Sequence, residues 1–190
     1  MNIRKVIIRS TLSLLLGSGM AVAADFDKGL KAAQSGDYKT ALAEWTPLAE
    51  QGYAAAQGNL GLIYDNGRGV PKNAKTAVKW YTKAAEQGHP KSQFNLGYMY
   101  DNGLGVPEND KTAVKWYTKA AEQGEIDAQT NLGAFYQYGD GVMTDYLRAY
   151  MWFNLASYNG SKEGSKNKNI LAKKMTSSDI SKAQDMSSRC

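Results

Sequence analysis

Residues 53–88 read YAAAQGNLGLIYDNGRGVPKNAKTAVKWYTKAAEQG, and residues 89–124 read HPKSQFNLGYMYDNGLGVPENDKTAVKWYTKAAEQG. Both stretches are 36 residues long, and they share 26 identities. A third stretch, residues 125–160, has 12 identities to the second and keeps its glycines in register. A fixed period of this size indicates one supersecondary unit stacked on copies of itself. Such a stack offers a long surface rather than one deep catalytic pocket.

Each unit is predicted to form two antiparallel helices joined by a glycine-rich loop. In the first unit the helices span residues 54–64 and 74–87, and Ala56, Leu60 and Tyr64 make one apolar stripe along the first of them. The same spacing predicts the buried face of the second helix. That face consists of Ala77, Trp80, Tyr81, Ala84 and Ala85. The loops are expected to be anchored in the core by Val70, Val106 and Val142.

The units share the pattern A/S-Q-x-N-L-G-x-x-Y, then G-x-G-V, then A-x-x-W-x-x-x-A-x-x-x-G. This pattern resembles the Sel1-like repeat family, whose members are relatives of tetratricopeptide-repeat proteins. The period of 36 residues favours the Sel1-like family over the 34-residue tetratricopeptide repeat. The resemblance implies an all-α, right-handed solenoid and a role in protein interaction.

The repeats are expected to be flanked by a helical element on each side, within a solenoid of about four helix pairs over residues 24–160. Residues 25–52 are predicted to be a degenerate first pair, with helices at 26–35 and 38–51 and Pro47 disturbing the second. Residues 161–190 are predicted to form two short helices that cap the stack. Ile170, Leu171 and Met175 are expected to face the last repeat. The alternative for this tail is a basic docking segment for a partner.

The first 23 residues are predicted to be a signal peptide. A basic start is followed by an apolar stretch, Leu12–Val22, which is too short to span a membrane. Ala21-Val22-Ala23 is a small-x-small cleavage pattern, so the mature protein is expected to begin at Ala24. Export would place the protein in the periplasm or outside the cell. The alternative is an uncleaved anchor.

Charge and cysteine content narrow the possible partners. The formal charge of the chain is +5. Residues 24–161 contain 13 basic and 15 acidic side chains, whereas residues 162–190 contain 7 and 3. A basic tail of this size on an exported protein is expected to be a solvated face, so nucleic acid is not expected as a partner. The single cysteine, Cys190, allows no internal disulfide, which leaves a mixed disulfide, a Cys190-linked dimer or an idle thiol.

Catalytic and metal-binding patterns are largely missing from the sequence. His89 is the only histidine and lies at a repeat junction, so no metal site and no cofactor are expected. Ser165 and Lys168 match S-x-x-K, but the sequence lacks the S-D-N partner of serine acylases. A non-enzymatic protein is therefore predicted. The alternative, suggested by cysteine-rich Sel1-like relatives, is a hydrolase or a penicillin-type binder of cell-wall ligands.

By resemblance to tetratricopeptide proteins, the first helix of each unit should line the concave surface. A helical wheel places four columns of residues on that surface, starting at positions 55, 58, 59 and 62. The column at 59 is always asparagine, whose amide can bind a peptide backbone. The predicted partner-binding residues are Asn59, Asn95, Asn131, Lys91, Phe94 and Tyr98.

Two alternatives remain open for these columns. Variation among copies is also what simple surface drift produces, and the asparagines could instead bond the adjacent helix or the loop. The leading prediction is an exported adaptor that binds a protein or an extended peptide through its concave face. A structural role through Cys190 dimerisation is a third hypothesis.

Overall fold

The computed structural model describes residues 24–189, and this range contains ten helices and no strand. The helices are α1 (Phe26–Gln34), α2 (Tyr38–Glu50), α3 (Ala54–Asn66), α4 (Ala74–Glu86), α5 (Pro90–Asp101), α6 (Asp110–Glu122), α7 (Ile126–Tyr138), α8 (Tyr146–Tyr158), α9 (Lys162–Ala172) and α10 (Ser177–Ser187). The predicted signal peptide and Cys190 lie outside the described residues. None of the ten helices in residues 24–189 combines the length and the hydrophobicity of a membrane-spanning segment.

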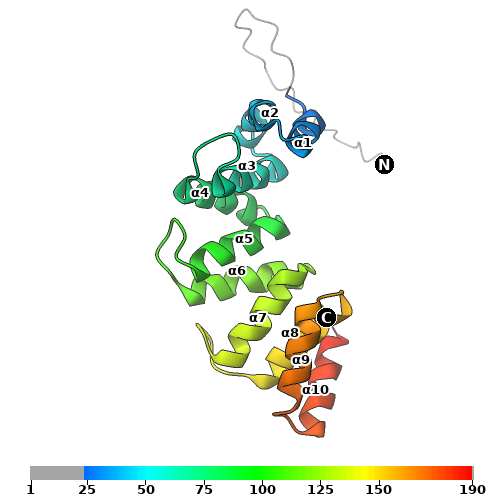
Figure 1. The fold of residues 1–190 in the computed structure, drawn as a ribbon. Helices are drawn as coiled ribbons and strands as arrows, with labels where there is room; N and C mark the ends of the chain where they lie inside the picture. Colours follow the sequence, from blue (N-terminus) through cyan, green and yellow to red (C-terminus); the bar gives the residue numbers. More distant parts are fainter. Residues whose placement is uncertain (1–23, 190) are drawn as a thin grey trace, which may run out of the picture.

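The helices form one elongated array in which each pair packs against the next (Figure 1). We call α1, α3, α5 and α7 the A helices, and α2, α4, α6 and α8 the B helices. Each helix from α1 to α8 contacts the helix that follows it in the chain. In addition, α3 touches α5 and α7 touches α9, whereas consecutive B helices make no comparable contact in the described chain. In residues 24–189, α1 with α3 and α5 with α7 likewise make no comparable contact. The chain is an all-α repeat solenoid.

Side-chain caps fix where the B helices begin. Asn73 accepts a hydrogen bond from the Thr76 amide, and Asn109 and Asp145 make the equivalent bonds at α6 and α8. These bonds satisfy amides that have no partner within the helix. Pro47, predicted as a disturbance, lies inside α2, and the helix continues through it to Glu50.

Glycine in the A helices allows the B helices to approach closely. A Cβ atom at Gly97 would lie 2.7 Å from the ring of Tyr117, and Gly61 and Gly133 lie equally close to Tyr81 and Phe153. In the first pair, Trp45 occupies the place of these rings and covers Gly29. We call the contact between an A helix and the B helix of its own pair a joint. Each joint is thus built from one glycine and one aromatic ring that is almost fully buried.

The loops also pack against the start of the preceding B helix. Gly105 and Gly141 have positive φ values, and a Cβ at either position would meet the backbone at the start of the preceding B helix within 2.5–2.6 Å. Val70, Val106 and Val142 pack against the hydrophobic clusters, which confirms their predicted role as loop anchors.

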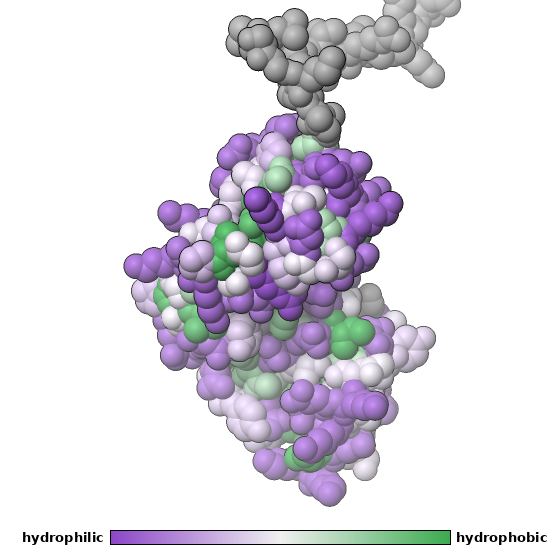
Figure 2. Space-filling view, turned by 45° about the horizontal axis from the view of Figure 1, so that its top comes forward, coloured by the Kyte–Doolittle hydropathy of each residue, from purple (hydrophilic) through white to green (hydrophobic). Residues whose placement is uncertain are grey.

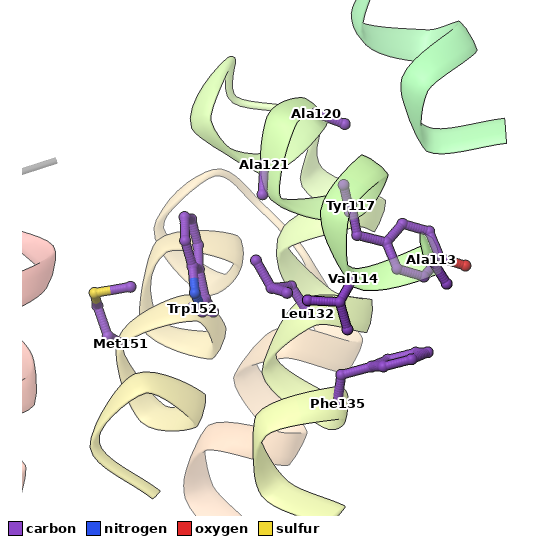
Figure 3. Close-up of a cluster of buried hydrophobic side chains, with 10 residues drawn as sticks. Ala113, Val114, Tyr117, Ala120, Ala121, Leu132, Phe135, Met151 and Trp152 are labelled. Carbon is purple, nitrogen blue, oxygen red and sulfur yellow. The ribbon is translucent and has the colours of Figure 1, made fainter. Parts of the chain in front are cut away.

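The core runs as a series of clusters along the array. Figure 3 shows the cluster between α6, α7 and α8, where Val114, Leu132 and Trp152 point toward one another. Trp116 is buried in the preceding cluster. Trp80 was predicted to be buried in the same way, but it is only half-buried, and the Lys83 ammonium lies 4.5 Å from its ring centroid.

The last two helices close the C-terminal end of the array. Both pack on α8, and they contribute Leu171 and Ala183 to the last cluster. Thr176 caps α10, the second of the two short helices predicted for this segment. The prediction that Ile170 faces the last repeat is wrong: Ile170 is 43% exposed, because its neighbour Leu171 takes the buried position on α9.

Candidate interaction surface

The predicted partner-binding residues lie on the surface formed by the A helices α3, α5 and α7. We call this surface the A-helix face. Asn59, Asn95 and Asn131 are half-buried in it, whereas Lys91 and Tyr98 are exposed. The repeat thus brings the three asparagines to equivalent positions on α3, α5 and α7.

Asn95 and Asn131 lie next to phenol groups from the preceding B helix. The Tyr117 hydroxyl donates a hydrogen bond to Asp101 Oδ2 at 3.0 Å, and burial raises the pKa of this phenol, which the nearby Asn131 amide opposes. Asn95 opposes the burial-driven rise in the pKa of Tyr81 in the same way. The buried Tyr81 hydroxyl has no hydrogen bond of normal geometry. The Asn95 and Asn131 amides are therefore turned in part toward the adjacent B helix, as the alternative interpretation of the asparagine column foresaw.

Two carboxylates lie at the same joints. Burial raises the pKa of Asp101, and the hydrogen bond from Tyr117 counteracts this rise. Asp65 occupies the equivalent position beside Tyr81 and adds to the raised pKa of that phenol. Both carboxylates are half-buried, so they add negative charge to the rim of the A-helix face.

The column that begins at position 58 is not part of the open surface, contrary to the sequence prediction. Gly58 is buried under His89 and Ser92, and Thr130 is buried with its hydroxyl 3.1 Å from that of Ser161. The start of the next A helix covers this column, which a wheel of a single helix cannot reveal. Phe94 belongs to the same column; it is half-buried, and its ring centroid lies 5.8 Å from that of Tyr117. Phe94 therefore contributes to the core as well as to the surface.

His89 has a structural contact at the entry to α5. Its Nδ1 accepts a hydrogen bond from the Ser92 amide at 3.3 Å and lies 2.9 Å from the Ser92 hydroxyl. Burial, and then the charge of Lys91, lower the pKa of His89. The neutral ring thus serves as the N-cap of the helix.

Three glutamines link α3, α5 and α7 to the preceding B helix by hydrogen bonds, and the sequence analysis assigned them no role. Gln57, Gln93 and Gln129 are buried, and each donates through Nε2 to a carbonyl in the last turn of the preceding B helix. The acceptors are Ala49, Ala85 and Ala121, at 2.9–3.1 Å. Each glutamine oxygen then accepts from an amide side chain at the end of its own unit, namely Gln87, Gln123 or Asn159. The identity of these glutamines in all three units was the available signal.

A groove of about 910 Å³ lies near the C-terminal end of the array, between the ends of α6 and α8 and helix α10. Lys168 donates to Asn154 Oδ1 at 3.3 Å, and Asn154 donates to the Ser187 hydroxyl at 2.8 Å. The lysine of the S-x-x-K match is thus hydrogen-bonded to Asn154 on α8.

Known proteins share this architecture. The family model of the Sel1 repeat matches residues 54–89, 90–125 and 126–161. The chain belongs to the Sel1 repeat family. Sel1-repeat proteins are generally protein–protein interaction modules, and their fold is typically a non-enzymatic scaffold.

Among solved structures, a Sel1 repeat protein from Oxalobacter formigenes is similar to this Sel1-repeat chain, with 37% identity and a TM-score of 0.74 over 77% of the chain. A protective antigen of uropathogenic Escherichia coli strains, described as having an SLR fold, has 34% identity and a TM-score of 0.55 over 86% of the chain. The chain spans 60% of the first protein and 44% of the second.

Cysteine rich protein B of Helicobacter pylori is more distant. It has 22% identity and a TM-score of 0.51, and the alignment covers 73% of this chain and 92% of that protein. This likeness concerns the fold alone. No curated protein matches the sequence.

Proposed function

We propose that this Sel1-repeat chain is an exported, non-enzymatic adaptor that binds a protein or an extended peptide through its A-helix face. The observation that carries the proposal is the repetition of asparagine at three equivalent, half-buried positions beside the exposed Tyr98 and Lys91. Amide groups can donate to and accept from a peptide backbone, while aromatic and cationic side chains often anchor interfaces.

The character of the surface supports binding through scattered contacts. On the side of the molecule shown in Figure 2, hydrophobic residues form separate spots in a mainly hydrophilic surface. A partner held by such a surface would use a few apolar contacts together with polar groups, as in many non-obligate interfaces.

The proposed location is the periplasm or the cell exterior. Its support is the sequence pattern of residues 1–23, which combines a basic start, a short apolar stretch and a small-x-small site. N-terminal sequencing of protein recovered from the periplasmic fraction tests this proposal. A mature start at Ala24 is expected, whereas an intact Met1 in the membrane fraction would contradict export with cleavage.

The binding proposal is tested with a partner isolated by cross-linking in envelope extract and then purified for direct titration. Tyr98→Ala should weaken its affinity by about 1–2 kcal/mol, as expected for an interface anchor. The matched control is Tyr158→Ala on α8, since Tyr158 is 89% exposed and lies away from the A-helix face. Circular dichroism checks that both variants keep their helices. Equal affinity of Tyr98→Ala and the wild type would remove the proposed face from the interaction.

A further inference from the structure

Two consecutive B helices each carry a stripe of three exposed lysines. The lysines recur at every fourth position, so each stripe runs along one side of its helix. The stripe of α4 is Lys75, Lys79 and Lys83, and that of α6 is Lys111, Lys115 and Lys119. The two stripes are 36 residues apart, so they lie on equivalent sides of equivalent helices. We call these six residues the lysine face.

The two stripes belong to one surface, because α4 and α6 follow one another along the array (Figure 1). Trp116 of α6 packs in the same buried cluster as Val78 and Tyr81 of α4. Side chains of the two helices therefore meet between the stripes, and the lysine face crosses from one repeat to the next.

Tryptophan rings lie beside the lysines on both helices. The Lys83 ammonium is 4.5 Å from the ring centroid of Trp80. The ammonium groups of Lys119 and Lys115 are 5.4 Å and 5.6 Å from the ring centroid of Trp116. Trp116 is buried, whereas Trp80 is half-buried and so adds part of an aromatic ring to the surface.

The charge of this region is separated rather than uniformly basic. Residues 54–138, which contain α3 to α7, have nine basic and eight acidic side chains, and six of the nine basic ones form the lysine face. The carboxylates of α4 and α6 are Glu86, Asp110 and Glu122, and the loops that lead into these two helices add Arg68, Lys72 and Glu108. Glu86 and Glu122 are the last residues of their helices, and Asp110 is half-buried. In the part of the chain that the structure describes, no lysine of the face forms an ion pair.

The same side of α8 is covered by another part of the chain. The equivalent positions there are Leu147, Met151 and Leu155, which are buried or half-buried. Helix α10 packs on α8, and its Ile180 and Met186 join the clusters to which these side chains belong. This side of a B helix therefore binds another element where it is apolar. On α4 and α6 it is charged and exposed to solvent.

The composition of the lysine face favours a bilayer surface over a protein as its ligand. Protein interfaces depend on a few aromatic or arginine anchors, and in residues 24–189 the large exposed apolar side chains lie on elements other than α4 and α6. Lysine is a hydrated point charge on a flexible stem, so it is attracted to diffuse negative charge without a fixed geometry. Clusters of about four to eight basic residues on an amphipathic helix are typical of attraction to anionic lipids, and tryptophan favours the level of the headgroups.

We infer that the lysine face adsorbs to the surface of a bilayer that contains anionic phospholipids, with Trp80 turned toward the headgroups. This inference goes beyond the proposed function, because it concerns α4 and α6, whereas the proposed partner binds on α3, α5 and α7. Adsorption would retain the adaptor at a membrane surface while the A-helix face binds its partner.

Vesicle binding by the full mature chain tests the inference. Cosedimentation compares vesicles of phosphatidylcholine alone with vesicles that also contain about 30 mol% phosphatidylglycerol. At about 0.05 M salt the partition coefficient should be at least about tenfold higher for the anionic vesicles, and most of the difference should disappear at about 0.5 M salt. Equal partitioning into the two kinds of vesicle would overturn the inference.

Charge reversal locates the binding surface. Lys79→Glu together with Lys115→Glu reverses the centre of both stripes and should lower the partition coefficient at least about tenfold. The matched control is Lys162→Glu together with Lys166→Glu on α9, where both lysines are exposed and the change in net charge is the same. Circular dichroism and thermal melting check that both proteins fold. An equal loss in the two double variants would assign the attraction to net charge and overturn the inference.

Trp80 reports which side of the molecule faces the bilayer. Of the four tryptophans, Trp80 is half-buried, and Trp45, Trp116 and Trp152 are buried. Anionic vesicles that also contain a lipid with a nitroxide on its headgroup should therefore quench the fluorescence of the wild type much more than that of Trp80→Phe. Equal quenching of the two proteins would show that another side faces the membrane.

An acidic polypeptide is the competing ligand, and its binding is measured with fluorescein-labelled poly-L-glutamate. If this polymer binds through Lys79 and Lys115 while anionic vesicles do not bind, the lysine face recognises an acidic chain and the inference is wrong. The proposed function is tested separately: Tyr98→Ala should leave vesicle partitioning unchanged, and the lysine reversals should leave the affinity for the purified partner unchanged. Failure of either proposal therefore leaves the other standing.

Discussion

The second unit (residues 89–124) and the third (residues 125–160) use the same kind of joint but fill it differently. In the second unit, Tyr117 covers Gly97 and donates its hydroxyl to Asp101. In the third unit, Phe153 covers Gly133, and the position of Asp101 is occupied by Gln137. The third unit therefore lacks both the hydroxyl group and its carboxylate acceptor.

This comparison distinguishes the part of the joint that every pair has from the part that only some pairs have. A ring against a glycine recurs in every pair, so the apolar contact belongs to the scaffold. The hydroxyl–carboxylate pair adds a half-buried acid to the A-helix face in the middle of the array. Where α9 and α10 close the end of the array, the ring joins an apolar cluster with Leu171 and Ala183. The predictions below test the shared scaffold first and then the difference.

The largest expected loss of stability follows the removal of a core tryptophan. Trp116→Ala and Trp152→Ala should each destabilise the fold by about 3–5 kcal/mol, because both side chains are buried and leave large cavities. Chemical denaturation followed by circular dichroism measures this change. Trp80→Ala should cost less, because Trp80 is only half-buried. A near-neutral Trp116→Ala variant would mean that the second and third units do not share the same core.

The hydrogen bonds of Gln93 and Gln129 should contribute equally to the stability of the two units. Gln93→Ala and Gln129→Ala each remove a buried donor from a carbonyl of the preceding B helix, which should cost about 1–3 kcal/mol. The exposed Gln34, at the end of α1, is the control, and Gln34→Ala should change the free energy of unfolding by less than about 0.5 kcal/mol. A large loss of stability from only one of the two changes would show that the glutamine hydrogen bonds are not equivalent.

The polar difference between the units is tested by a double-mutant cycle. Tyr117→Phe alone should destabilise by about 1–2 kcal/mol, since it leaves the half-buried Asp101 without its donor. Adding Asp101→Gln reproduces the arrangement of the third unit and should recover most of this loss. A coupling energy on the order of 1 kcal/mol is expected, and strict additivity of the two changes would show that the pair does not act as a unit.

The sequence was sufficient for the repeat, the helix pairs and the anchoring of the loops. These features depend on contacts within one unit or between identical copies, so periodicity reveals them. The wheel failed at Gly58 and Thr130 because the helix that buries them belongs to the next unit. The same limit applies to Phe94, whose contact with Tyr117 crosses from one helix to another.

Two further features could have been found by following the 36-residue spacing along the sequence and comparing the residues at each position. The asparagine column and the column that begins at position 62 continue to Asn167 and Ile170 at the same spacing of 36, but the divergent sequence of residues 161–190 concealed the register. The glutamine column was visible as an identity. Its role was not, because a buried amide in a helix can bond in several directions and only its neighbours decide which.

The smallest expected effect concerns the entry to each unit, where the second has His89 and the third has Glu125. His89 caps α5 through its neutral ring, whereas Glu125 makes no side-chain bond at the start of α7. Since burial lowers the pKa of His89, the folded state binds a proton less readily than the unfolded state. Stability should therefore decrease as the pH falls through the range from the usual value of about 6.5 to the lower folded value.

His89→Asn should remove this pH dependence, because asparagine retains the capping bond and does not titrate. His89 is the only histidine of the chain, so no other histidine obscures the change. Thermal melting between about pH 5 and about pH 7 measures it. Glu125→Asn is the matched variant in the third unit and should keep the wild-type slope, since His89 is still present. An equal slope in the wild type and His89→Asn would assign the pH dependence to other groups and leave His89 as a cap only.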